Sequence, residues 1–189
     1  MPYPVEFEMD YAERRSRLTT FFRYFLAIPH FVFATFYGLA FYIVLIIAWF
    51  ALLFTARWPE SLYGFSCGFL RYITRVGAYI YLGVDRYPAF SGADDDSYPV
   101  RVRIAPALER YSRLKVFFRP IYAILASVIR YALGIVLMFV AFLSWFAIVV
   151  TGRQPAALQN ALNFSLRYTT QSDALLFLIT ETYPPFRDS

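Results

Sequence analysis

Residues 31–56 read FVFATFYGLAFYIVLIIAWFALLFTA, a run of 26 residues without a charged side chain. About 20 apolar residues in a helix are enough to cross the hydrocarbon layer of a bilayer. A second run, residues 131–152, holds 22 residues without a charge. Arg57 and Arg153 follow these runs, each with a proline two residues later, which is typical of a helix that ends at a membrane surface. We therefore predict two transmembrane helices.

The sequence around both runs is repeated. ERRSRL at residues 13–18 recurs as ERYSRL at residues 109–114, an offset of 96 residues. At this offset residues 13–90 align without a gap with residues 109–186, and about 29 of the 78 pairs are identical. Self-similarity at a fixed period indicates repeated structural units, so we predict two tandem copies of one unit.

The two units occupy residues 1–92 and 98–189, and an acidic linker, residues 93–97, joins them. Its composition predicts a flexible, solvated connection. Three adjacent aspartates (Asp94–Asp96) are the alternative signal for a divalent cation, but no spaced set of oxygen ligands surrounds them. We therefore predict no metal site.

Each unit begins with a short segment in which apolar and charged residues alternate. In residues 5–9 the apolar residues alternate with two glutamates (Glu6 and Glu8). In residues 100–104 the apolar residues alternate with two arginines (Arg101 and Arg103). A period of two with one apolar face predicts a β-strand. If the strands pair, the glutamates face the arginines, and the alternative is two solvated extended segments.

A basic amphipathic stretch precedes each uncharged run. Basic side chains mixed with Phe and Leu at helical spacing are typical of a helix at a bilayer interface. We predict that these side chains contact lipid headgroups: Arg14, Arg15, Arg17 and Arg23 in the first unit, and Arg110, Arg113, Lys115 and Arg119 in the second.

A second helix is predicted in each unit, at residues 60–84 and 156–180. Both are long enough to cross a bilayer, but they carry Arg71 and Arg75, or Arg167 and Asp173. Ionisable groups at membrane depth are costly and are usually packed against protein. These four residues are therefore candidate intramembrane polar contacts, and the alternative is that both helices lie in the interface or re-enter.

The distribution of arginine favours four crossings. With four transmembrane helices, all ten basic residues between positions 14 and 23 or 101 and 119 lie on one side, and only Arg57 and Arg153 lie on the other. Basic loops stay in the cytoplasm. The expectation is thus an all-α integral membrane protein of two helical hairpins, with both termini and the short β segments at the cytoplasmic face.

The first unit contains several motifs in this order: Ala27-Ile28-Pro29-His30, Trp49-Phe50-Ala51, Leu70-Arg71-Tyr72 and Tyr87-Pro88-Ala89-Phe90. This pattern resembles a bacterial membrane family known only as a domain of unknown function (number 4389), present once in each unit. The second unit departs from it by reading Ala123-Ile124-Leu125-Ala126 in place of the first motif. The resemblance implies the fold and the bacterial inner membrane, and it implies no activity.

No catalytic motif is apparent in the sequence. It has no Gly-rich phosphate loop, zinc-ligand spacing or nucleophile elbow, and Cys67 and His30 are each the single residue of their type. We predict no catalytic residue, cofactor or nucleic-acid partner. The favoured function is a non-enzymatic scaffold or accessory subunit that binds anionic lipid headgroups.

Two other functions stay open. An anion-selective transporter or channel component would work as an oligomer, with a polar path lined by Arg71, Arg75 and Arg167 between parallel repeats. A lipid-modifying enzyme would require three side chains to converge in a cleft: Asp85, Glu181 and His30.

Overall fold

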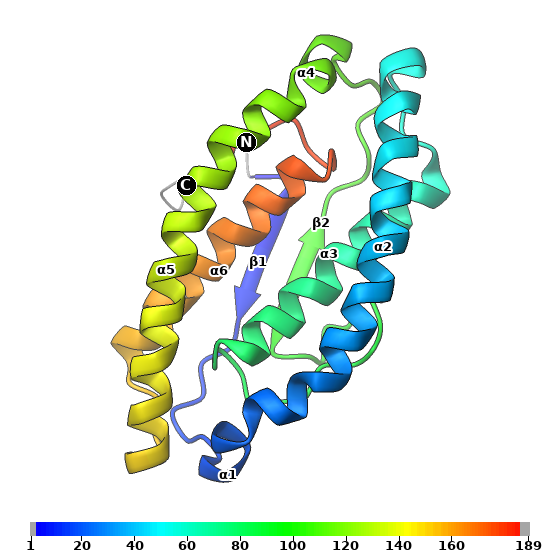
Figure 1. Cartoon of the computed structure of the whole chain (residues 1–189). Coiled ribbons are helices and arrows are strands. Elements are labelled where there is room, and N and C mark those ends of the chain that lie inside the picture. The colour runs from blue at the N-terminus through cyan, green and yellow to red at the C-terminus, as the bar shows by residue number, and fades with distance from the viewer. Residues whose placement is uncertain (1–2, 186–189) are drawn as a thin grey trace.

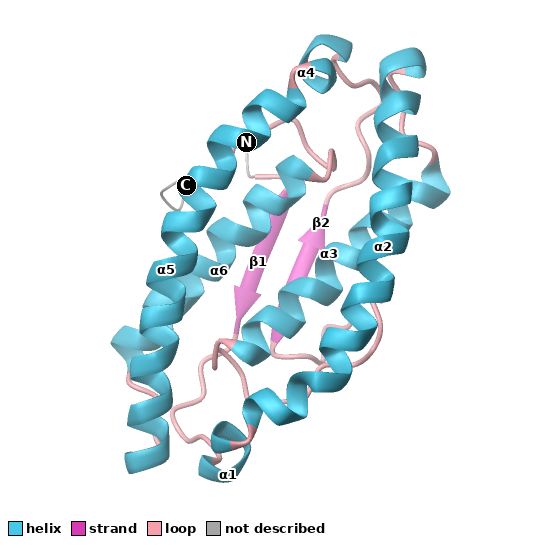
Figure 2. Cartoon of the chain, in the orientation of Figure 1, coloured by secondary structure: helices cyan, strands magenta, loops and turns pink. Residues whose placement is uncertain are grey.

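The computed structural model describes residues 3–185 and is mostly helical, with one small sheet (Figure 2). Phe186, the partner of Phe90 in the repeat, lies outside the described residues. The elements of the first unit are β1 (Val5–Met9), α1 (Arg17–Phe21), α2 (Arg23–Thr55) and α3 (Glu60–Ile80). Those of the second are β2 (Val100–Ile104), α4 (Arg113–Phe117), α5 (Arg119–Thr151) and α6 (Ala156–Leu176). The same order of elements in both units confirms the predicted repeat.

The two predicted strands form one antiparallel sheet, with Phe7 opposite Val102 at its centre. The register places Glu8 opposite Arg101, as their alternation predicted. Arg101 donates to Glu8 at 3.1 Å and to Asp10 at 2.7 Å, so the ion pairs lie on the outer face of the sheet. Exposed cross-strand pairs of this kind contribute only about 0.2–1 kcal/mol each.

The two units are related by an approximate two-fold rotation, and they run in opposite directions. Thr74 and Thr170, which are equivalent in the repeat, are hydrogen-bonded to each other at 3.2 Å. The strands are antiparallel, and α2 and α5 also run in opposite directions on the two flanks of the molecule (Figure 1). Each unit therefore begins beside the place where the long helix of the other unit ends.

Backbone bonds fix this relation at both ends of the molecule. Arg14 and Arg153 form an antiparallel bridge, and the Arg15 N–H donates to the Gly152 carbonyl at 3.0 Å. At the other end, the Tyr111 N–H donates to the Ala56 carbonyl at 2.8 Å. The four-crossing prediction places the basic entry segments and the turns at Arg57 and Arg153 on opposite faces of a bilayer, and this placement stays a prediction. In the structure these segments are bonded directly to each other.

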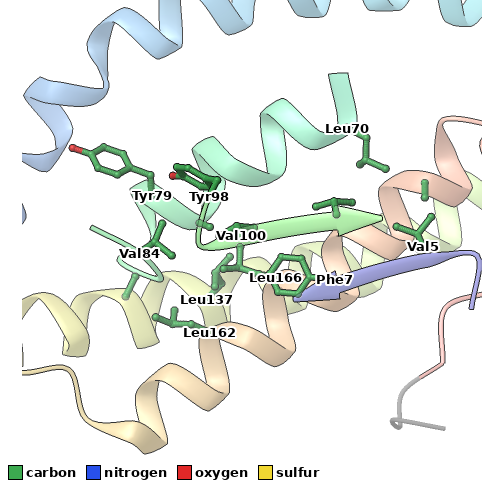
Figure 3. Close-up of a cluster of buried hydrophobic side chains, with 14 of the residues drawn as sticks. Val5, Phe7, Leu70, Tyr79, Val84, Tyr98, Val100, Leu137, Leu162 and Leu166 are labelled. Atoms are coloured by element: carbon green, nitrogen blue, oxygen red, sulfur yellow. The ribbon is translucent and has the colours of Figure 1, made fainter. Parts of the chain in front are cut away.

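The main core lies between the sheet and the helices α3 and α6 (Figure 3). The inward side chains of both strands, such as Phe7 and Val100, pack against Leu70 and Leu166 of these helices. The strand of each unit contacts the second helix of the other unit, so β1 lies beside α6 and β2 beside α3. The units are therefore interlocked through the core.

The long helices α2 and α5 pack on α3 and α6, respectively, with their backbones apart from the sheet. Among the described residues they are the two helices that are long and apolar enough to cross a membrane, by length and composition alone. Only 17% of the most apolar window of α2 and 28% of that of α5 is buried. Both helices therefore present wide apolar surfaces outward, unlike the core helices of a soluble domain.

Helices α3 and α6 begin after Pro59 and Pro155 and are 21 residues long. Each is followed by a left-handed residue, Leu82 with φ 65° and Leu178 with φ 63°. Both helices are long enough to cross a membrane, but neither is apolar enough to be a candidate span, so the four predicted transmembrane helices are not confirmed. The coarser prediction, a helical protein with a small sheet, is confirmed.

The linker between the units is packed on α3 rather than solvated throughout. Gly92 contacts Gly68 so closely that a Cβ atom on Gly92 would overlap the Gly68 carbonyl. Arg75 donates to the carbonyl of Ala93 at 2.7 Å, which holds the same segment. Gly64 and Gly68 have the spacing of a helix-contact motif. Gly68 contacts Gly92 next to the linker, and Gly64 faces open space.

Candidate functional site

Five of the eight predicted lipid contacts are exposed, and they lie at the two ends of the molecule. They are Arg14, Arg17, Arg110, Arg113 and Lys115. The first two lie at the end of the molecule where the first unit meets the C-terminal end of α5. The other three lie at the opposite end, where Arg113 donates to the Phe54 carbonyl at 2.7 Å. Basic side chains therefore flank both ends of the apolar helices.

The other three predicted lipid contacts, Arg15, Arg23 and Arg119, are buried, and this part of the prediction is wrong. Arg23 is 1% exposed and donates to the carbonyls of Tyr79 and Val84 at 2.9 and 2.6 Å. The Tyr79 carbonyl lies at the C-terminal end of α3, where a helix leaves its last acceptors unpaired and attracts positive charge, and the Val84 carbonyl lies in the loop beyond that end. The arginines bind helix ends rather than lipid.

The same arrangement recurs around the other two arginines. Arg15 donates to the carbonyl of Gly83 at 2.8 Å, and burial lowers the pKa of its guanidinium while Asp85 opposes that shift. Arg119 donates to the carbonyl of Thr180 at 3.1 Å, just beyond the end of α6. Both helices that end at a left-handed leucine are thus capped by an arginine from the start of a long helix.

The structure does not bring together the four candidate intramembrane residues. Arg71 donates to the Val102 carbonyl at 3.2 Å and to Asp94 at 3.4 Å, and Arg75 is buried against the linker. Arg167 lies 5.8 Å from the centre of the Phe164 ring. The two arginines of α3 thus face the linker and β2 rather than a shared polar path.

Asp173 pairs with Arg130 of its own unit at 2.6 Å, not with an arginine of the other unit. The sequence analysis does not single out Arg130, which immediately precedes the uncharged run at 131–152. In the structure it lies well inside α5, since that helix begins at Arg119. A single charge within an extended apolar helix was the available signal.

The three side chains required for an enzyme site do not converge. Asp85 pairs with Arg23 and accepts the Ser16 N–H, whereas Glu181 accepts the Ser112 N–H at 2.7 Å at the other end of the molecule. His30 is buried, 3.0 Å from the hydroxyl of Tyr72. Within residues 3–185, no group of three metal-ligating side chains is present.

The sheet gives the molecule one strongly charged face. Glu6, Glu8, Asp10, Arg101 and Arg103 all point outward, since their neighbours in the strands point into the core. Hydrogen bonds from Arg101 hold the pKa of Asp10 below its usual value. The acidic linker extends this surface, because Arg103 lies 3.8 Å from Asp96.

A cavity of about 440 Å³ lies between α2 and the start of α5. It is lined by Leu45 and Trp49 of α2, Pro120 of α5, and Leu178. The exposed side chains of these helices, among them Phe36 and Phe139, make their side of the molecule apolar.

Comparison with known proteins identifies one family. A family model described as "Domain of unknown function (DUF4389)" matches residues 17–92 and, a second time, residues 113–187. The matches cover most of the chain and coincide with the two structural units. No curated protein and no solved structure matches the chain.

Proposed function

The chain belongs to the DUF4389 family, with one domain in each half, and from this premise and its geometry we propose a non-enzymatic membrane protein that lies flat on one bilayer leaflet. The apolar sides of α2 and α5 enter the leaflet, and the charged sheet faces the cytoplasm together with both ends of the chain. In this position the protein serves as a scaffold or accessory subunit for other membrane proteins.

The observation that carries this proposal is the separation of two unlike faces. The charged sheet lies on one side of α3 and α6, and the long helices pack on these same two helices with their backbones apart from the sheet. Exposed apolar residues recur along the whole of α2, from Phe25 at 70% exposure to Phe54 at 74%. Continuous apolar patches of this size on a protein surface mark contact with a membrane or with another protein.

A crossing orientation conflicts with the same charges. Helices α2 and α5 have 33 residues each, so each is about 50 Å long and long enough to cross. If they crossed, the sheet beside them would be carried to membrane depth with exposed Glu6, Glu8 and Arg103. Charged groups near the centre of a bilayer cost roughly 3 kcal/mol or more each. An in-plane orientation avoids this cost entirely.

The second candidate is the multi-pass arrangement with four spans, and the length and composition of α2 and α5 support two of these spans. It requires the units to separate from the interlocked arrangement described above, because Arg14 and Arg153 are bonded through their backbones. An anion-conducting oligomer is a form of this second candidate.

Labelling from one side of the membrane distinguishes these arrangements. Single cysteines replace Arg14, Arg57, Arg110 or Arg153 in a Cys67→Ala background, and an impermeant maleimide is added to sealed vesicles. We expect all four positions to react from the same side, because the in-plane protein exposes both ends to one compartment. Four spans place Arg57 and Arg153 opposite the other two positions. Crossing by α2 and α5 alone places the two ends of the molecule in different compartments.

The exposed basic residues are expected to select anionic lipid. Each basic side chain near an anionic surface contributes about 1 kcal/mol, or roughly fivefold in partitioning. Protein diluted from detergent into a mixture of anionic and neutral vesicles should therefore collect in the anionic ones after flotation. Replacing Arg14, Arg17, Arg110 and Arg113 together by Gln should remove most of that preference. An equal distribution of the wild-type protein would contradict headgroup binding.

A further inference from the structure

A second cavity, of about 730 Å³, lies between α3, α5 and α6. It lies beside the two-fold axis, since both Thr74 and Thr170 line it. Tyr131, Ile135 and Met138 of α5 also line it, and all three are more than half exposed on the apolar side. The cavity therefore opens toward the surface that we assign to the leaflet.

The equivalent place in the first unit is filled by aromatic rings. Phe41 stacks on Phe69 with ring centres 4.3 Å apart, and Phe177 lies 4.5 Å from Phe41. The equivalent residues in the repeat are Leu137, Ser165 and Tyr81. Leu137 and Ser165 have smaller side chains than the phenylalanines, and Tyr81 lines the cavity. Two related halves of one framework thus differ, with one half packed and the other hollow.

The hollow half also contains an ion pair that the packed half lacks. Arg130 and Asp173 both line the cavity, and their equivalents in the first unit are Ala34 and Gly77. Asp173 is 6% exposed, whereas the side chain of Arg130 is 35% exposed. A buried ion pair seldom stabilises a fold more than apolar packing would. Ionisable pairs facing an apolar surface usually serve a ligand.

The charges indicate which headgroup fits. A guanidinium beside a carboxylate has no net charge, so a purely anionic headgroup that approached Arg130 would be repelled by Asp173. A headgroup with a phosphate and an ammonium group complements both, because the phosphate binds arginine and the ammonium binds a carboxylate. The volume lies within the range of small-molecule sites, roughly 300–1,000 Å³.

We propose that this cavity binds the zwitterionic headgroup of a phospholipid with a primary amine, taken from the leaflet below. The phosphate binds Arg130 and the ammonium group binds Asp173. The acyl chains pass Tyr131, Ile135 and Met138 into the bilayer. This direction of entry rests on the proposed function, whereas the selectivity for the headgroup depends only on the cavity.

The test uses the whole chain in detergent, so that it does not depend on the orientation in a membrane. Short-chain phosphatidylethanolamine, short-chain phosphatidylglycerol and inorganic phosphate are titrated separately, and bound ligand is counted by native mass spectrometry. We expect one phosphatidylethanolamine per chain, at least tenfold weaker binding of phosphatidylglycerol, and no retained phosphate. Retention of phosphate alone, or equal binding of the two lipids, would overturn the proposal.

Two variants make the test specific for the cavity. Gly134→Leu should lower binding at least tenfold, because a side chain there enters open space in the cavity. Gly64→Leu, at another glycine that faces open space in a helix but outside the cavity, should bind like the wild type. Asp173→Asn should reverse the preference toward phosphatidylglycerol by leaving Arg130 as the only charge. If Asp173→Asn folds and keeps the original preference, the assignment of the ammonium site is wrong.

These outcomes are separable from those of the labelling experiment. Selective lipid binding with labelling on opposite sides would preserve the cavity and remove the in-plane orientation. Labelling on one side without selective binding would support the in-plane orientation and contradict the lipid-binding cavity.

Discussion

Replacing Arg23 by methionine is expected to lower the free energy of unfolding by about 3–5 kcal/mol, the range for breaking a buried charged pair. The guanidinium donates to two carbonyls at the end of α3, pairs with Asp85, and lies 4.4 Å from the centre of the Tyr79 ring. Methionine keeps much of the apolar stem but removes the charged donor from all three acceptors. Asp85 keeps the Ser16 N–H and the Tyr79 carbonyl keeps the Leu82 N–H, whereas the Val84 carbonyl loses the hydrogen bond from Arg23. Part of the desolvation of these groups is then uncompensated.

Thermal unfolding followed by circular dichroism in a mild detergent measures this effect. For a chain of this size, a change of 1 kcal/mol shifts the Tm by roughly 2–4 °C, so a decrease of at least 6 °C is expected. Arg17→Met is the matched control, since Arg17 is exposed in the adjacent helix α1. A similar Tm for both variants would mean that Arg23 does not hold the end of α3.

Two aspartates on the apolar side are expected to release the protein from membranes. Ile43 and Phe139 are equivalent in the repeat and are 55% and 63% exposed. An aspartate at hydrocarbon depth costs roughly 2.5–3.5 kcal/mol relative to no insertion, and the lost apolar contact adds to that cost. The double variant Ile43→Asp with Phe139→Asp should therefore weaken membrane binding by more than a thousandfold.

Sedimentation after an alkaline carbonate wash measures the retained fraction. The control places the same two charges on the charged face, as Ser97→Asp with Ala105→Asp, at residues that are also exposed. We expect the control to sediment with the membranes and the Ile43→Asp, Phe139→Asp variant to stay in the supernatant. Retention of both variants would indicate that protein, such as a second copy of the chain, covers these helices.

Much of the local structure could be predicted because its signals are periodic or repeated. The strands follow from alternation, whereas their pairing was one of two alternatives, and the structure shows it with Glu8 opposite Arg101. The long helices follow from uncharged runs, although both begin earlier than those runs suggest. Helix α2 begins at Arg23 and includes Pro29, which the sequence presents as a boundary. The proline is accommodated in the first turns of a long helix.

The direction of the second unit relative to the first could not be predicted. A repeat at a constant offset is the same whether the copies lie parallel or are turned around an axis through the sheet. The antiparallel arrangement depends on backbone bonds such as that between Tyr111 and Ala56, which have no signature in side-chain sequence. The predicted placement of segments on the two sides of a membrane assumed parallel units, so it has to be reconsidered for the antiparallel arrangement.

Which basic side chains are exposed and which are buried also could not be predicted from the sequence. Arg17 and Arg23 lie in the same amphipathic stretch, yet one is exposed and the other is 1% exposed. An arginine is equally suited to a phosphate and to the carbonyls of a helix end, so residue type does not separate the two roles. Arg130 and Asp173, in contrast, were detectable, since both interrupt the match between the units at positions held by Ala34 and Gly77.

The interlocked core has a consequence for the history of the chain. Because the strand of each unit packs against the second helix of the other, a single unit would leave half of its core uncovered. An ancestor with one unit would have been an obligate homodimer, in which every substitution appeared twice. Joining two copies in one gene removed that constraint. One half was then able to keep its aromatic packing while the other gained a hollow, charged pocket, an asymmetry that identical subunits do not permit.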